Sequence, residues 1–151
     1  MDAAGYDTDF ILWTKRQSDL LRRMAAGERV NSEVDWLNIA EEIESLGRSD
    51  RRELRNRIAT ILEHLIKLQA SPARDPRDGW VDTIEEQRRR LRLVIDDSPS
   101  LRAAIPASIE SELEPAREAV LRSLARRRET AIVDPQGLAY TQDQVLGDWL
   151  P

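Results

Sequence analysis

The chain has 151 residues, with 23 Lys and Arg, 28 Asp and Glu, one His, no Cys and a net charge of -5. The lack of Cys excludes disulfides and thiolate metal or redox sites, and no apolar run approaches the 18 residues of a membrane-spanning helix. The acidic N-terminus lacks the basic and apolar pattern of a signal peptide, which predicts a cytoplasmic protein without membrane contact. The length fits one domain, predicted over residues 1–151.

A first helix is predicted to follow the N-cap residue types Asp7, Thr8 and Asp9 and to end near Gly27. Its apolar residues have helical spacing: Phe10, Trp13, Leu20, Leu21 and Met24.

A second helix is predicted to begin after the natural N-cap Asp35 and to continue to about Ala70. Its apolar residues keep a mostly three-and-four spacing: Ile39, Ile43, Leu46, Leu54, Ile58, Ile61, Leu65 and Leu68. Gly47 interrupts this pattern at a cost of about 1 kcal/mol relative to Ala. The spacing favours one long helix with Gly47 as a candidate kink, and a separate second half capped by Ser49 or Asp50 is the alternative.

Residues 71–79 contain Pro, Asp and Gly and are predicted to form a loop before a third helix at about 80–95. Ser98 and Pro99 then resemble a helix start, and helical spacing continues from Leu101 to Leu124. Within it, Pro106 predicts a break and Pro115 a kink or break. Thr141 is expected to cap a short helical turn that ends at Leu146. The fold class predicted is therefore all-α: an antiparallel bundle of about four helices, with long second and fourth helical regions and a short C-terminal helical turn.

Charge is distributed in blocks along the chain. The net charge is -5 over residues 1–47, +4 over 48–92, -4 over 93–115, +4 over 116–128 and -4 over 129–151. Such blocks could direct helix pairing or form a self-complementary dimer surface. The simpler interpretation is solvated helix faces with pairs four residues apart, such as Glu85–Arg89, Glu86–Arg90 and Glu118–Arg122.

One constellation on the second helix could carry chemistry. A rotation of 100° per residue places four side chains along one flank of the predicted apolar face, and we call them the polar seam: Glu42, Glu53, Arg57 and His64. The seam could be a site in the interior of the bundle. The alternative, which we favour, is a structural network in which Glu53 pairs with Arg57 and His64 is hydrogen-bonded at a helix interface.

Catalytic chemistry has little support in the sequence. Carboxylate-bridged di-metal bundles use a Glu-x-x-His pair on each of two helices, whereas this chain has one His and no such pair. A single metal ion held by His64 with Glu42 or Glu53 is the remaining alternative. There is no Gly-rich phosphate loop, nucleophile elbow or Cys nucleophile. We therefore predict no catalytic residue, metal or cofactor.

Arginine outnumbers lysine by 21 to 2, and the runs 88–90 and 126–128 could contact phosphate. Consecutive residues spread around a helix, however, and the chain is acidic overall, so nucleic acid is not the expected partner. The four Trp are predicted to be core and helix-end packing residues: Trp13, Trp36, Trp80 and Trp149.

Several segments resemble the bacterial family called domain of unknown function 29. They lie at residues 6–10, 34–49, 64–67, 83–90 and 98–101 and in the tail from Tyr140 to Pro151, and the core of the resemblance is Glu41-Glu42-Ile43-Glu44-Ser45-Leu46-Gly47. The chain departs from the family pattern at Leu68, where Trp is frequent, and at Pro106 and Pro115. The resemblance implies a compact all-α bundle and no particular activity.

These observations lead to an expectation about function. We expect a small helical-bundle protein that acts through protein–protein interaction or homo-oligomerisation. The alternatives are a ligand-binding or metal-dependent enzyme that uses the polar seam and a weak nucleic-acid binder that uses the Arg clusters.

Overall fold

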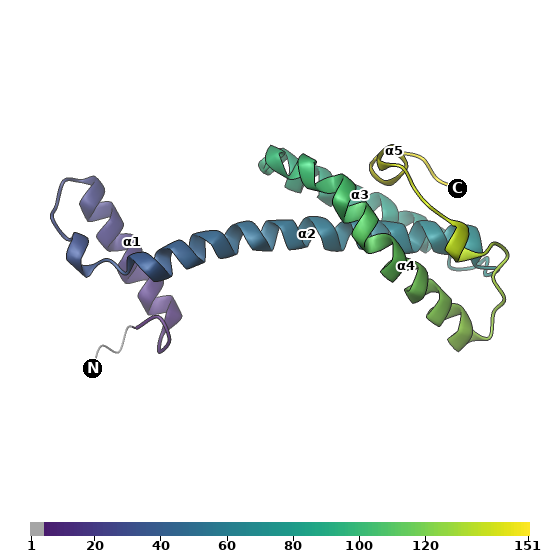
Figure 1. Cartoon of the computed structure of the whole chain (residues 1–151), viewed down its shortest axis with the longest axis horizontal. Helices are drawn as coiled ribbons and strands as arrows, with labels where there is room; N and C mark the ends of the chain where they lie inside the picture. Colours follow the sequence, from purple (N-terminus) through teal and green to yellow (C-terminus); the bar gives the residue numbers. More distant parts are fainter. Residues whose placement is uncertain (1–4) are drawn as a thin grey trace. The chain divides into compact units, whose positions relative to one another are not determined.

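The computed structural model describes residues 5–151 and contains only helices and connecting segments there (Figure 1). The α-helices are α1 (Phe10–Ala25), α2 (Trp36–Ala70), α3 (Arg77–Asp97), α4 (Ile105–Arg127) and α5 (Gln142–Leu146). Three 3-10 helices connect them: η1 (Asn31–Glu33), η2 (Pro99–Ala104) and η3 (Pro135–Gly137). The all-α bundle predicted from periodicity and capping is confirmed. No helix in the described part of the chain is both long and apolar enough to cross a membrane.

The chain divides into two compact units, Met1–Arg48 and Ser49–Pro151, with α2 contributing residues to both. We call them the N-terminal and C-terminal units and describe each by itself. The assignment of residues 1–151 to one domain stays a prediction.

The N-terminal unit is a helical hairpin fastened at its turn by Asp35. The side chain of Asp9 caps α1 by accepting a hydrogen bond from the amide of Leu12. Trp13 Nε1 donates to Asp35 Oδ2 over 3.1 Å, and the backbone amide of Asp35 donates to Gln17 Oε1 over 2.8 Å. Four apolar side chains are buried among the described residues of this unit: Leu20, Val30 and Val34 form a cluster against which Met24 and Ile39 pack, and Trp13 is 4% exposed.

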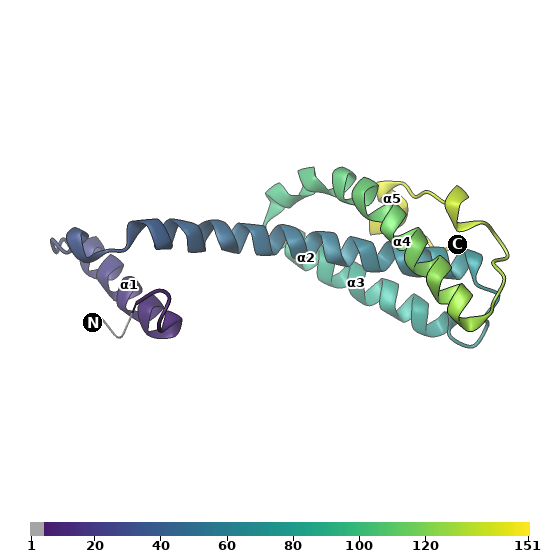
Figure 2. The ribbon, with the colours of Figure 1, turned by 60° about the horizontal axis from the view of Figure 1, so that its bottom comes forward.

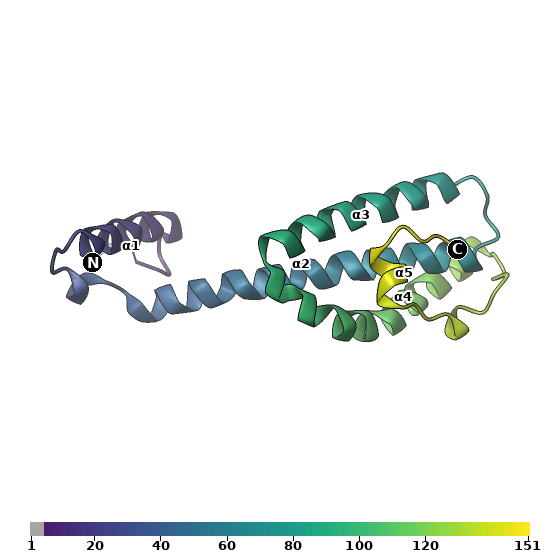
Figure 3. The same cartoon turned by 90° about the horizontal axis from the view of Figure 1, so that it is seen from above.

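The C-terminal unit contains the larger core. The second half of α2 is accompanied by α3, which runs back along it, and by α4, which runs in the opposite direction to α3 (Figures 2 and 3). The buried face of α2 consists mainly of Leu54, Ile58, Ile61, Leu62, Leu65, Ile66 and Leu68. It meets Ile84, Leu91 and Ile95 of α3 and Ile105, Ile109, Ala116, Val120 and Leu124 of α4.

A buried arginine on α3 fastens the C-terminal segment to the core. Arg88 is only 3% exposed, and its guanidinium donates to the backbone carbonyls of Gln144, Val145 and Trp149 over 2.6–2.9 Å. The Tyr140 hydroxyl adds a bond to Gln69 Oε1 over 2.6 Å. A capping box at Thr141 starts α5 at the predicted residue.

Several predicted element boundaries need correction. Helix α2 is unbroken at Gly47, so the alternative of a separately capped second half is wrong. Helix α3 begins at Arg77 rather than near Trp80. Ser98 is the N-cap residue and Pro99 begins a new helix as predicted, but that helix is a 3-10 helix and Ser98 forms no side-chain cap. Helix α4 continues through Pro115 without a break; this is possible because Pro115 and Ser111 are exposed, and water can satisfy the carbonyl that the proline leaves unbonded.

The N-terminal unit buries fewer of its apolar residues than the sequence pattern predicts. Ile43 and Leu46, expected on the buried face of the second helix, are 64% and 69% exposed. Trp36 is 49% exposed and Trp149, in the C-terminal unit, is 37% exposed, so neither is a core residue. Both have contacts at the ends of elements: the indole of Trp36 donates to the carbonyl of Asn31, and the ring of Trp149 lies against Tyr140. The predicted helical spacing is confirmed, but spacing within one helix does not determine whether a neighbouring element covers its apolar stripe.

Candidate functional site

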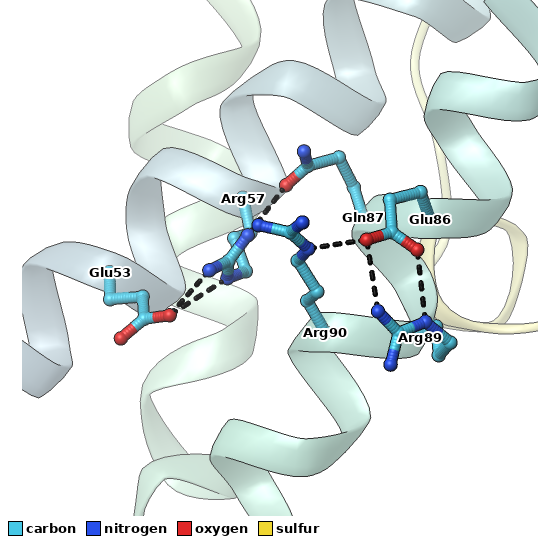
Figure 4. A network of polar contacts seen from close by, with 6 residues as sticks. All are labelled: Glu53, Arg57, Glu86, Gln87, Arg89 and Arg90. Atoms are coloured by element: carbon cyan, nitrogen blue, oxygen red, sulfur yellow. Dashed lines mark hydrogen bonds and ion pairs between the residues drawn. The ribbon is translucent and has the colours of Figure 1, made fainter.

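Glu53 and Arg57 are the two members of the polar seam that the structure brings together. The Nε and Nη2 atoms of Arg57 both donate to Glu53 Oε1, over 3.0 and 2.5 Å. The Nη1 atom donates across to Gln87 Oε1 on α3 over 3.0 Å, so the guanidinium is held from two helices (Figure 4). The pairing of Glu53 with Arg57 matches the structural network that was favoured from the sequence.

A polar groove of about 310 Å³ lies at this point between α2 and α3. Its lining residues are Ser49, Arg52, Glu53, Asn56, Arg57, Thr60 and Gln87. Six of them recur at intervals of three or four residues along α2. Because this spacing places side chains on one face of a helix, the six form one wall of the groove. The groove offers donors from guanidinium, amide and hydroxyl groups and acceptors from one carboxylate.

Glu42 has a different partner, within the N-terminal unit. The Tyr6 hydroxyl donates to Glu42 Oε1 over 2.5 Å, and this hydrogen bond to a carboxylate raises the pKa of Tyr6 to about 12. Tyr6 also packs edge-on against Phe10 and Trp13. Glu42 therefore anchors the segment that precedes α1.

His64 is a half-buried residue bonded to its own helix. Its Nδ1 atom lies 2.8 Å from the carbonyl oxygen of Thr60, one turn earlier. Burial lowers the pKa of His64 below its usual value of 6.5, so the ring is held neutral near pH 7. In the neutral ring Nδ1 carries the proton that it donates to Thr60. His64 does not line the polar groove.

The described residues include no group of three or more His, Asp or Glu side chains placed to hold a metal ion. Glu63, the carboxylate next to His64 in the chain, pairs instead with Lys67 over 2.6 Å. Glu42 and His64 thus have partners of their own, apart from the Glu53–Arg57 pair.

The arginine run 88–90 is largely occupied by contacts within the protein. Arg88 is buried beneath the C-terminal segment, while Arg89 and Arg90 both bind Glu86, over 2.9 and 2.5 Å. These two cations lower the pKa of Glu86 to about 2. Arg89 pairs with Glu86 and not with Glu85, so the predicted Glu85–Arg89 pair is wrong. The predicted Glu86–Arg90 and Glu118–Arg122 pairs are confirmed.

A second candidate surface lies on the N-terminal unit and was missed at the sequence level. Eight of the twelve large apolar side chains exposed among the described residues belong to it. We call these residues the N-terminal apolar surface: Phe10, Ile11, Leu12, Leu21, Trp36, Leu37, Ile43 and Leu46. The sequence pattern included four of them, Phe10, Leu21, Ile43 and Leu46, as apolar residues with helical spacing, and it predicted Ile43 and Leu46 to be buried.

Comparison with known proteins identifies one family. The family described as "Domain of unknown function DUF29" matches residues 6–150. No curated protein and no solved structure matches the chain. The family description names no reaction, ligand or partner.

Proposed function

Since the chain belongs to the DUF29 family, whose description names no activity, we propose from its own surfaces that it is a self-associating interaction protein. The N-terminal apolar surface is the contact face, and a second copy of the chain is the partner. The observation that carries the proposal is the concentration of exposed large apolar side chains in residues 10–46. Single exposed apolar residues are ordinary on protein surfaces, whereas extended apolar patches mark interaction sites. Among the eight residues, the spacing of Trp36, Ile43 and Leu46 places these three on one face of α2.

The first half of α2 has the residue spacing of a helix–helix seam. Trp36, Ile39, Ile43 and Leu46 follow one another at intervals of three, four and three residues. This is the a/d spacing by which two helices pack side chains into each other's gaps. Ile39 is partly covered by the core of its own unit, and the other three side chains are exposed.

The N-terminal unit has a small core, so burial of further apolar side chains in an interface would stabilise it. Four buried apolar residues, with Met24 and Ile39 packed against three of them, form the core of a unit of 48 residues. Domains below about 60 residues bury only about 60% of the surface of their unfolded chain and are marginally stable, so oligomerisation commonly supplements them. Ile43 and Leu46 are about two thirds exposed, so covering them would contribute about 1–2 kcal/mol for each side chain.

A second copy is the occupant best supported by the geometry of the stripe. A twofold-symmetric interface uses the same patch on both chains. When two α2 helices meet antiparallel at the middle of the stripe, Trp36 of one copy lies opposite Leu46 of the other. Ile39 then lies opposite Ile43, so every apolar residue in the stripe meets an apolar partner.

Sedimentation velocity over a concentration series tests the proposal with the double variant Ile43→Ser/Leu46→Ser. We expect the wild-type chain to form dimers and the variant to dissociate at least about tenfold more readily, since each 1.4 kcal/mol changes the dissociation constant tenfold. The matched control is Leu93→Ser, which removes a 53%-exposed leucine from α3 in the C-terminal unit.

Two results would contradict the proposal. One is a wild-type chain that stays monomeric at every concentration. The other is an equal loss of association in the control, which would place the interface on the C-terminal unit. Circular dichroism of both variants establishes that their helices remain intact.

A further inference from the structure

The polar groove lies outside the surface proposed for self-association, and its polar side chains have no part in that proposal. All seven of its lining residues belong to the C-terminal unit, and Arg57 is fixed within it by Glu53 and Gln87. A guanidinium held in place from two sides is pre-organised, so little side-chain freedom is lost when its remaining N–H groups bind a ligand.

Arg52 supplies the groove with a cation that has no internal partner. It is exposed and forms no ion pair or hydrogen bond with any residue that the structure describes. Asn56 and Ser49 lie one turn to either side of it on the same face of α2, and their side chains are likewise unbonded. Three unused donor groups therefore line one wall, with Arg57 beside them.

The balance of charge around the groove favours an anion. Arg57 is neutralised by Glu53, whereas Arg52 is not neutralised. The residue that precedes Gln87, Glu86, is shared by Arg89 and Arg90, so this cluster of three side chains carries one net positive charge (Figure 4). The low pKa of Glu86 is consistent with this surplus of positive charge.

Glu53 favours a ligand that carries a hydrogen-bond donor as well as a negative charge. Both bonds from Arg57 end on Oε1, which leaves Oε2 available to accept a hydrogen bond. A bare anion beside this oxygen would be repelled, whereas a ligand that also carries a hydroxyl group would donate to it.

We infer that the groove binds a small phosphate ester with a neighbouring hydroxyl group. Arg52, Asn56 and the free N–H groups of Arg57 contact the phosphate, and Glu53 accepts the hydroxyl proton in a hydrogen bond. Charge-assisted bonds from guanidinium to phosphate are among the strongest hydrogen bonds available on a protein surface. The volume of the groove, about 310 Å³, falls at the lower end of the range for small-molecule sites.

Isothermal titration calorimetry of the full chain with glycerol 3-phosphate tests the inference, with Arg52→Gln as the variant. Its matched control is Arg51→Gln, which removes an equally charged, exposed residue that does not line the groove. We expect saturable binding by the wild type, about tenfold weaker binding by Arg52→Gln and a change of less than about twofold in the control. Inorganic phosphate should bind more weakly than the ester, because it has no alcohol hydroxyl, separate from the phosphorus, to donate to Glu53 while its phosphate oxygens contact Arg52 and Asn56.

Three outcomes would overturn the inference. The first is the absence of saturable binding at up to about 10 mM ester, a concentration beyond the millimolar affinity of the weakest specific sites. The second is equal weakening in both variants, which would indicate unspecific attraction to positive charge. The third is a short single-stranded DNA that binds and is displaced by salt alone, which would make the surface a polyanion patch. Melting curves without ligand establish that the exposed substitutions leave the fold intact.

Discussion

Arg88 and Arg89 are neighbours in the sequence with very different physical roles. Arg88 is buried and donates three hydrogen bonds to main-chain carbonyls 56–61 residues away. Arg89 is exposed and pairs with Glu86, one turn earlier on the same helix. A run of arginines is therefore no guide to a shared function, because the three-dimensional surroundings of each side chain differ.

Replacing Arg88 with Ala is expected to destabilise the fold by about 3 kcal/mol. The substitution leaves the carbonyls of Gln144, Val145 and Trp149 without their donor, and unsatisfied buried acceptors cost about 1–3 kcal/mol each. Urea unfolding measures the loss, and limited proteolysis should show cleavage after residue 138.

Arg89→Ala is the control for this prediction. It removes only a surface ion pair, whose contribution is about 0–1 kcal/mol. Equal stability losses in the two variants would show that the carbonyl contacts of Arg88 contribute no more to the free energy of unfolding than a surface ion pair.

The lowered pKa of His64 should make the free energy of unfolding depend on pH. Burial lowers its pKa in the folded chain, so between that pKa and the unfolded value near 6.5 the unfolded chain binds more protons. The contribution of His64 is therefore fully present above pH 6.5 and is lost as the pH falls through the folded pKa. We expect the free energy of unfolding to decrease between pH 7.5 and pH 5.5.

The His64→Gln variant isolates this effect, because the chain has no other histidine. Urea unfolding at the two pH values should give a smaller difference for the variant than for the wild type. An unchanged pH dependence in the variant would assign the effect to other groups.

At the scale of the element, α2 shows how one continuous helix can have two surroundings. Its second half is covered on the face of Leu54, Ile58 and Ile61, all fully buried. Its first half presents Ile43 and Leu46 to solvent with the same helical spacing. Helix formation depends on backbone hydrogen bonds and local propensity, so it does not require that each stripe be covered equally.

The end of α5 provides a test at the scale of an element. The amide of Gly147 closes the helix by donating to the carbonyl oxygen of Asp143 over 2.8 Å, and a Cβ at Gly147 would lie 2.7 Å from that oxygen. Gly147→Ala is expected to lower the melting temperature through a loss of about 1–3 kcal/mol.

Gly137→Ala is the matched control, because a Cβ at Gly137 meets no atom within 4 Å. Its free energy of unfolding should change by less than about 0.5 kcal/mol. A Gly147→Ala variant as stable as this control would mean that α5 accommodates the methyl group by a small shift.

At the scale of the whole molecule, the charge of the two units differs. Residues 1–48 carry six basic and ten acidic side chains, whereas residues 49–151 carry 17 and 18. The net charge of -5 is therefore concentrated in the unit that presents the apolar surface. Two copies that meet through this unit bring two charges of -4 together.

Self-association should for this reason strengthen with salt. Raising NaCl from about 50 to about 500 mM shortens the distance over which these charges repel to a few Å, while the apolar contact is retained. Sedimentation velocity should show a lower dimer dissociation constant at high salt. A higher constant would mean that attraction between opposite charges, and not apolar burial, holds the copies together.

Much of the fold could be predicted from the sequence alone. Asp9, Asp35 and Thr141 marked helix starts because an N-cap acts on amides only two or three residues away. The periodicity of α2 likewise identified its apolar stripes, and the Glu53–Arg57 pair followed from a spacing of four residues. Each of these features arises within one or two turns of the chain.

The tertiary structure alone decided which stripes are covered and which polar groups meet across helices. Gln87 joins Arg57 from 30 residues away, and Arg88 reaches the C-terminal carbonyls from more than 50. The exposure of Ile43 and Leu46 depends in the same way on the absence of a covering element. Local hydrogen bonding thus determined the helices, whereas the surfaces on which function is proposed depend on packing between distant segments.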